Sequence, residues 1–113
     1  MINILEINGY KAVISYDPEI GIFRGEFVGL NGGADFYAAT VEGLREEGNR
    51  SLKVFLEMCA EDGVNPHREF SGRFNLRIPP ELHERIAVLA QASDRSINAW
   101  MTEALDLESK QGN

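Results

Sequence analysis

The sequence predicts an α+β fold in two parts: a small sheet covered by one helix, and then a strand followed by two helices. Residues 1–40 contain β-rich segments, such as KAVISYD and IFRGEFV, on either side of the turn sequence DPEIG. From Val41 to about Asp62 the hydrophobic residues recur at helical spacing. Residues 73–78 then alternate polar and apolar side chains before two further helical stretches.

The first part is expected to be an antiparallel meander with a helix packed on it. Its predicted strands are residues 11–17, 22–28 and 34–39, with residues 1–7 as a further edge strand. Thr40 is a suitable N-cap for the helix, and Cys59 falls on its apolar face as a small hydrophobic residue. Gly48 lies on the same face, which predicts a close approach of the helix backbone to a strand.

A polar stretch without periodicity, GVNPHREFSG, follows the helix and is typical of a linker. The predicted organisation is an N-terminal domain over residues 1–65, a linker over residues 66–72 and a C-terminal domain over residues 73–113.

Amino-acid composition limits the class of protein to which this chain can belong. With 43% hydrophobic and 26% charged residues, the chain should be globular. No apolar run approaches the roughly 20 residues of a membrane span, and the N-terminus lacks a signal pattern, so we expect a cytoplasmic protein. Cys59, His67 and His83 do not have the spacing of a zinc site, so neither a metal nor a cofactor is expected.

The C-terminal part begins with a strand that has no partner in its own 43 residues, 71–113. The apolar set of this strand is Phe74, Leu76 and Ile78, and the polar set is Arg73, Asn75 and Arg77. Pro79 and Pro80 end the strand and can open a helix. The simplest partner is the same strand of a second copy, related by a two-fold axis, so we predict a homodimer whose core contains the apolar set and Trp100.

Such pairing would place the polar set on one face of a two-stranded ribbon, which fits the DNA major groove. Arginine can bind guanine bidentately and asparagine can bind adenine, so Arg73, Asn75 and Arg77 are the predicted base contacts. The predicted phosphate contacts are Ser96, as the N-cap of the last helix, with Ile97 and Asn98 in its first turn. The alternative interpretation is an ordinary edge strand and an ordinary capped helix.

The order of strand, Pro-Pro, helix, short turn and capped helix resembles the ribbon-helix-helix fold of bacterial repressors. Together with YDPEIGIFRGEFVGL, FLEMCAEDG, FSGRFNLRIPPELH and SINAW, it is similar to the HicB antitoxin family from about Tyr10 to Leu105. The resemblance implies an N-terminal domain like a partial ribonuclease H fold, and a C-terminal domain that binds operator DNA and represses its own operon. It also implies a HicA-like partner, a small basic toxin that cleaves mRNA. Asp94 stands at a turn where many relatives have Gly.

The charge distribution fits that partner. Residues 1–70 carry 12 Asp and Glu against 6 Lys and Arg, whereas residues 71–113 carry 6 against 5. An acidic surface attracts a basic ribonuclease and can cover its RNA-binding face. The candidate toxin contacts are Asp17, Glu19, Glu26 and Asp35, and the alternative is a solvated acidic face.

A nuclease and a stand-alone repressor are the two alternatives to the antitoxin function. The four carboxylates could hold Mg²⁺ for phosphodiester cleavage, but they indicate no shared locus, and the family's domain is a truncated one without nuclease function, so we expect no enzymatic activity. The protein could instead be a stand-alone ribbon-helix-helix repressor whose N-terminal domain binds a small ligand or oligomerises. In either case, N-terminal pairing of two DNA-binding dimers would give tetramers or larger assemblies.

Overall fold

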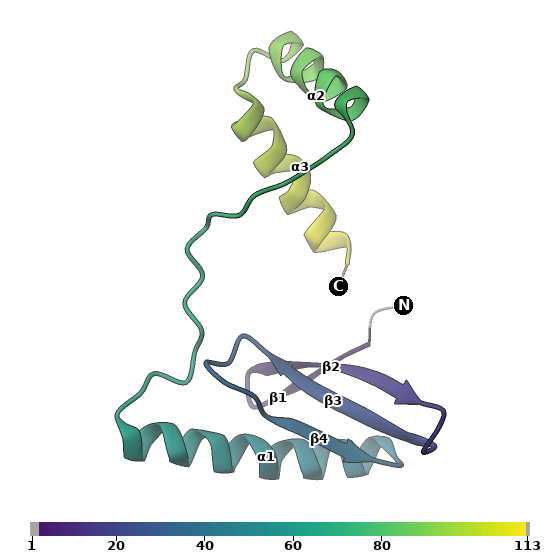
Figure 1. The fold of residues 1–113 in the computed structure, drawn as a ribbon, viewed down its shortest axis with the longest axis vertical. Helices are drawn as coiled ribbons and strands as arrows, with labels where there is room; N and C mark the ends of the chain where they lie inside the picture. The colour runs from purple at the N-terminus through teal and green to yellow at the C-terminus, as the bar shows by residue number, and fades with distance from the viewer. Residues whose placement is uncertain (1–2, 113) are drawn as a thin grey trace. The chain divides into compact units, whose positions relative to one another are not determined.

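The computed structural model describes residues 3–112, so the outermost residues of both predicted domains, 1, 2 and 113, lie outside the described part. The chain divides into two compact units between Ser71 and Gly72. Figure 1 shows a sheet with one helix in the N-terminal unit and a pair of helices in the C-terminal unit. The predicted α+β class is therefore confirmed.

The N-terminal unit contains a four-stranded antiparallel sheet whose strands follow one another in sequence order. Its strands are β1 (Ile4–Ile7), β2 (Tyr10–Asp17), β3 (Ile22–Val28) and β4 (Asp35–Ala38). The predicted hairpin, third strand and edge strand are thus present. The β2–β3 turn is closed by the Asp17 carbonyl, which accepts a hydrogen bond from the Gly21 amide at 2.8 Å. Gly21 has a φ of 67°, a conformation that favours glycine.

The helix α1 (Val41–Asp62) covers one face of this sheet (Figure 1). The core lies between them and contains Ile7, Ala12, Phe27, Phe36, Leu44 and Leu52. Thr40 caps the helix as predicted, since its hydroxyl accepts a hydrogen bond from the Gly43 amide at 3.0 Å. Gly63 ends the helix in the left-handed conformation, with a φ of 66°. Cys59 is buried, in agreement with its predicted place on the apolar face.

Two glycines allow the layers to approach each other closely. A Cβ atom on Gly48 would lie 2.3 Å from Cδ1 of Ile7, which confirms the predicted approach of α1 to a strand. A Cβ atom on Gly25 would lie 2.2 Å from Cζ of Phe36, because this ring lies directly over the β3 backbone. Neither position can hold a larger residue unless buried side chains move.

The segment that follows α1 is hydrogen-bonded to the loop between β3 and β4 before it reaches the C-terminal unit. The amide of Asn31 donates to the carbonyl of Pro66 at 2.8 Å, and the amide of Arg68 donates to the carbonyl of Gly29 at 2.9 Å. The first three residues of the predicted linker, 66–72, are therefore fixed to the N-terminal unit, because the β3–β4 loop offers them backbone hydrogen-bonding partners.

The C-terminal unit contains α2 (Pro80–Ala92) and α3 (Ile97–Gln111). Pro80 opens α2 as predicted, at a position where its missing N–H costs no helical hydrogen bond. Asp94 adopts the left-handed conformation, with a φ of 56°, in the turn between the helices. Aspartate tolerates this conformation better than most residues, so the turn forms without a glycine.

Candidate nucleic-acid interface and acidic sheet face

The predicted strand, residues 73–78, is extended but has no strand partner among the residues described in this single copy. Over residues 72–112, this unit contains two helices and no assigned strand. The backbone N–H and C=O groups of the segment consequently lack the ladder of hydrogen bonds that a sheet would provide. Pairing with a second copy stays a prediction.

The apolar set of this segment is not packed into a core within one copy. Phe74 is 73% exposed and Leu76 is 50% exposed, while Ile78 is half-buried. Among the described residues of the C-terminal unit, only Ile86 and Ala90 are buried hydrophobic residues. One copy of the unit therefore buries little apolar area, and domains of about 40 residues are commonly stabilised by oligomerisation.

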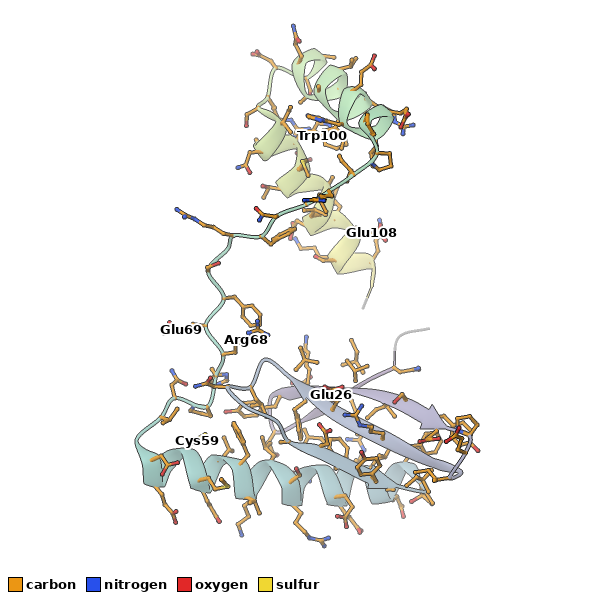
Figure 2. All side chains as sticks on the ribbon, in the orientation of Figure 1. Glu26, Cys59, Arg68, Glu69, Trp100 and Glu108 are labelled. Carbon is orange, nitrogen blue, oxygen red and sulfur yellow. The ribbon has the colours of Figure 1, made fainter. Side chains whose placement is uncertain are left out.

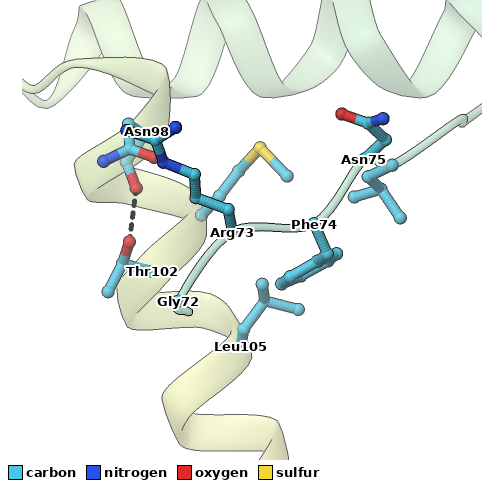
Figure 3. Close-up of a pocket in the computed structure, with 9 residues that line it drawn as sticks. Gly72, Arg73, Phe74, Asn75, Asn98, Thr102 and Leu105 are labelled. Carbon is cyan, nitrogen blue, oxygen red and sulfur yellow. Dashed lines mark hydrogen bonds between the residues drawn. The ribbon is translucent and has the colours of Figure 1, made fainter. Parts of the chain in front are cut away.

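The segment and α3 together form a groove (Figure 3). It is lined by Gly72, Arg73, Phe74, Asn75, Leu76, Asn98, Met101, Thr102 and Leu105. Residues of both the polar and the apolar set line it in a single copy. Their separation onto two faces was predicted for a strand paired with a second copy and stays a prediction.

Four residues of the groove were not among the predicted site residues: Gly72, Met101, Thr102 and Leu105. The last three lie three, four and seven residues after Asn98, and this helical spacing is the signal that could have identified them. The hydroxyl of Thr102 donates to the carbonyl of Asn98 at 2.7 Å (Figure 3).

The three predicted phosphate contacts lie together at the start of α3, and all three are exposed. Ser96 acts as the N-cap, because its hydroxyl accepts a hydrogen bond from the Ala99 amide at 3.0 Å. Ile97 and Asn98 are the first two helical residues, whose amides have no carbonyl partner within the helix. Trp100, in the next turn, is half-buried (Figure 2).

The structure brings together two of the four predicted toxin contacts. Glu26 and Asp35 are paired across β3 and β4 on the sheet face that points away from α1 (Figure 2). Arg24 lies between them, 2.6 Å from a carboxylate oxygen of Asp35 and 3.5 Å from one of Glu26. Hydrogen bonds to Asp35 and then Tyr37 raise the pKa of Arg24 above its ordinary value, so its guanidinium stays charged.

The other two predicted contacts, Asp17 and Glu19, lie at the β2–β3 turn. The side chain of Asp17 accepts a hydrogen bond from the Glu19 amide at 3.0 Å, which stabilises the turn. Arg24 was not among the predicted site residues, although its position two residues before Glu26 in a strand places both side chains on one face.

This uncovered face of the sheet also carries exposed hydrophobic side chains. They are Ile4, Val13, Val28 and Tyr37, each between 44% and 56% exposed. Ile4 is the register partner of Val13, and Val13 is the register partner of Glu26, so apolar and acidic side chains are interleaved. We refer to this surface, with Arg24, Glu26 and Asp35, as the open sheet face.

His, Cys, Asp and Glu side chains do not gather into a metal-binding group of three or more anywhere in residues 3–112. Over the same residues, no helix combines the length and the apolar character needed to cross a bilayer.

Comparison with known proteins gives a match to one family model. The model of the HicB family matches residues 55–105, from the last turns of α1 through most of α3. Over these residues the match agrees with the resemblance to the HicB family that the sequence predicts. No curated protein and no solved structure matches the chain.

Proposed function

We propose that the protein is an antitoxin that neutralises a HicA-like, mRNA-cleaving toxin by direct binding and represses its own operon by binding operator DNA. The family match over residues 55–105 is the observation that carries this proposal. In this proposal the N-terminal unit binds the toxin and the C-terminal unit binds DNA. Both actions are binding steps and require neither a cofactor nor a catalytic residue.

In this proposal the C-terminal unit is a ribbon-helix-helix dimer. The exposed Phe74 and Leu76 and the small core of the unit favour it, because a second copy would cover the apolar side chains and supply the missing strand. Ile78 and Trp100, both half-buried in one copy, would complete the shared core.

DNA recognition would then depend on the polar set. Arg73, Asn75 and Arg77 would contact base edges in the major groove, and each good bidentate pair contributes about 1–3 kcal/mol of discrimination. The start of α3, with Ser96, Ile97 and Asn98, would hold a backbone phosphate and so fix the register of the ribbon.

The N-terminal unit, in which one helix covers an antiparallel sheet, is the part we assign to a partial ribonuclease-H-like fold. Its open sheet face is the surface we propose for the toxin, because exposed apolar side chains lie there beside Glu26 and Asp35. A basic partner would be attracted by the carboxylates of Glu26 and Asp35, because the single positive charge of Arg24 neutralises their negative charge only in part.

Co-expression with the short reading frame next to this gene tests the proposal. We expect the two products to purify together and the purified protein to bind DNA from its own promoter, with masses that show two or four copies of this chain. DNA binding without any captured product would favour the stand-alone repressor. A metal-dependent nuclease activity that depended on Asp17 or Glu26 would contradict the proposal altogether.

A further inference from the structure

Two asparagines of the chain, Asn8 and Asn31, are followed directly by glycine. In such a pair the backbone nitrogen of the glycine can attack the side-chain carbonyl carbon of the asparagine, because glycine has no side chain to hinder the approach. In a folded protein this reaction also requires the peptide between the two residues to turn toward the asparagine side chain. The two pairs differ in how firmly the fold holds that peptide.

Asn8 and Gly9 form the tight turn between β1 and β2. Their φ angles, 51° and 84°, are those of a type I′ turn, and the residues on either side, Ile7 and Tyr10, are paired in the sheet. The side-chain amide of Asn8 also donates to Oδ1 of Asn49 in α1 at 2.8 Å. Cyclisation at Asn8 would therefore require this hydrogen bond to break and the hairpin turn to open.

Asn31 and Gly32 lie in the loop between β3 and β4, and both are exposed. The backbone amide of Asn31 donates to the Pro66 carbonyl at 2.8 Å, but its side-chain amide makes only a long contact, 3.4 Å, with the Asn65 carbonyl. The peptide that must turn consists of the Asn31 carbonyl and the Gly32 amide. Neither group has a hydrogen-bonding partner among the described residues, so no hydrogen bond restrains this peptide.

We propose that Asn31 is a site of spontaneous deamidation, and that the fold protects Asn8 from the same reaction. The Gly32 nitrogen attacks Cγ of Asn31 and loses its proton, the bond from Cγ to the side-chain nitrogen breaks, and this nitrogen leaves with the proton as ammonia. Water then opens the resulting succinimide ring at one of its two carbonyl carbons, which leaves either aspartate or isoaspartate at position 31. The reaction requires no oxidant and no cofactor.

Both products change the contacts of this loop within the N-terminal unit. In the aspartate product a carboxylate replaces the amide that faces the Asn65 carbonyl, so two acceptors oppose each other. In the isoaspartate product the main chain runs through the former side chain and is longer by one carbon atom. We therefore expect deamidation to weaken the neighbouring hydrogen bonds from Asn31 to Pro66 and from Arg68 to Gly29.

Peptide mapping by mass spectrometry tests the proposed site. The full-length protein is incubated in mildly alkaline buffer, either folded or in guanidinium chloride, and deamidation of the two peptides is followed over time. In the folded protein we expect Asn31 to react about tenfold or more faster than Asn8, because only Asn8 must first lose a hydrogen bond and a turn. In denaturant the two rates should converge. Equal folded-state rates, or a faster reaction at Asn8, would overturn the proposal.

A substitution in α1 tests why Asn8 is protected. Asn49→Ala removes the acceptor of the Asn8 side-chain amide, so it should accelerate deamidation at Asn8 by about fivefold and leave the rate at Asn31 unchanged. Arg50→Ala, at the next position of the same helix, is the matched control and should change neither rate. An unchanged rate at Asn8 in Asn49→Ala would contradict the protective role of this hydrogen bond.

Hydrogen exchange tests the effect on the loop. In protein that has been deamidated at Asn31, and in the variant Asn31→Asp, the Arg68 amide should exchange about fivefold faster than in fresh protein, whereas amides in the middle of α1 stay unchanged. If the Arg68 amide exchanges equally in all three samples, the expected effect on the loop is wrong. None of these measurements depends on the proposed antitoxin function.

Discussion

Single glycines determine how tightly the N-terminal unit packs. Gly25 lies beneath the ring of Phe36, which is 3% exposed, and Gly48 faces the similarly buried Ile7. The sequence alone predicted the role of Gly48, because a glycine inside an apolar helical stripe is costly unless another element approaches it. The role of Gly25 could not be predicted, since it depends on which side chain of the next strand lies opposite.

We expect Gly25→Ala to destabilise the N-terminal unit by about 1–3 kcal/mol, because the new methyl group would displace a buried aromatic ring. Urea unfolding followed by circular dichroism measures the change. Gly33→Ala is the control, because a Cβ atom there meets nothing within 4 Å. Equal stabilities of the two variants would show that Phe36 moves aside freely and would contradict the packing described here.

A second prediction at this scale concerns Arg77. Removing its guanidinium in Arg77→Ala should weaken operator binding by about 1 kcal/mol or more, through loss of a bidentate base contact. Toxin neutralisation should be unaffected. Gel-shift titration measures operator binding, and a co-purification assay measures toxin binding. If a folded Arg77→Ala variant lost both activities, the assignment of DNA binding and toxin binding to separate units would be wrong.

Asp35 provides the corresponding test of the open sheet face. Asp35→Asn removes a carboxylate and leaves Arg24 without its closest partner, so the face becomes less attractive to a basic toxin. We expect slower association and a weaker dependence of the rate on salt in stopped-flow measurements. Glu61→Gln, at an exposed position of α1 outside the four predicted toxin contacts, changes the net charge equally and is the control; equal effects of both variants would indicate long-range charge attraction without a defined contact.

Among the elements, those governed by local signals were predicted well. The helix α1 begins after Thr40 and ends before Gly63 because a cap and a left-handed glycine determine its ends. The Pro-Pro start of α2 and the Ser96 cap of α3 were predicted for the same reason. The attachment of Pro66 and Arg68 to the β3–β4 loop was not predicted, because its backbone hydrogen bonds join residues more than 30 positions apart and leave no periodic pattern.

Residues 73–78 are predicted to be a strand by their alternating pattern. Within the described part of one copy, no strand pairs with them. If a second copy does, Leu76→Asp should abolish dimerisation, since it places a charge in the shared core and loses the burial of a leucine, worth about 1.5–3 kcal/mol per copy. Sedimentation analysis would detect the change.

Asn75→Asp introduces the same charge one residue earlier, on the face predicted to point toward DNA. It should stay dimeric while losing affinity for DNA. If Leu76→Asp also stayed dimeric, the dimer would have to form through another surface.

For the whole molecule, the separation of charge between the units predicts two binding reactions with different sensitivities to salt. Operator binding should weaken steeply as the salt concentration rises. A plot of the logarithm of affinity against the logarithm of salt concentration should have a slope of about −0.9 for each phosphate that the protein neutralises. Toxin binding should retain more of its affinity, because the open sheet face also has apolar side chains to bury. Fluorescence anisotropy across a salt series would compare the two, and equal slopes would contradict this account.

The pairing of residues 73–78 between two copies is the claim on which the proposed repressor depends. Isotope-filtered NMR on dimers mixed from labelled and unlabelled chains tests it most directly. We predict contacts across the two chains among Phe74, Leu76 and Ile78, together with cross-strand amide contacts. If this segment contacts only α3 of its own chain while the protein still binds its operator, the ribbon does not form and DNA must be read by another surface.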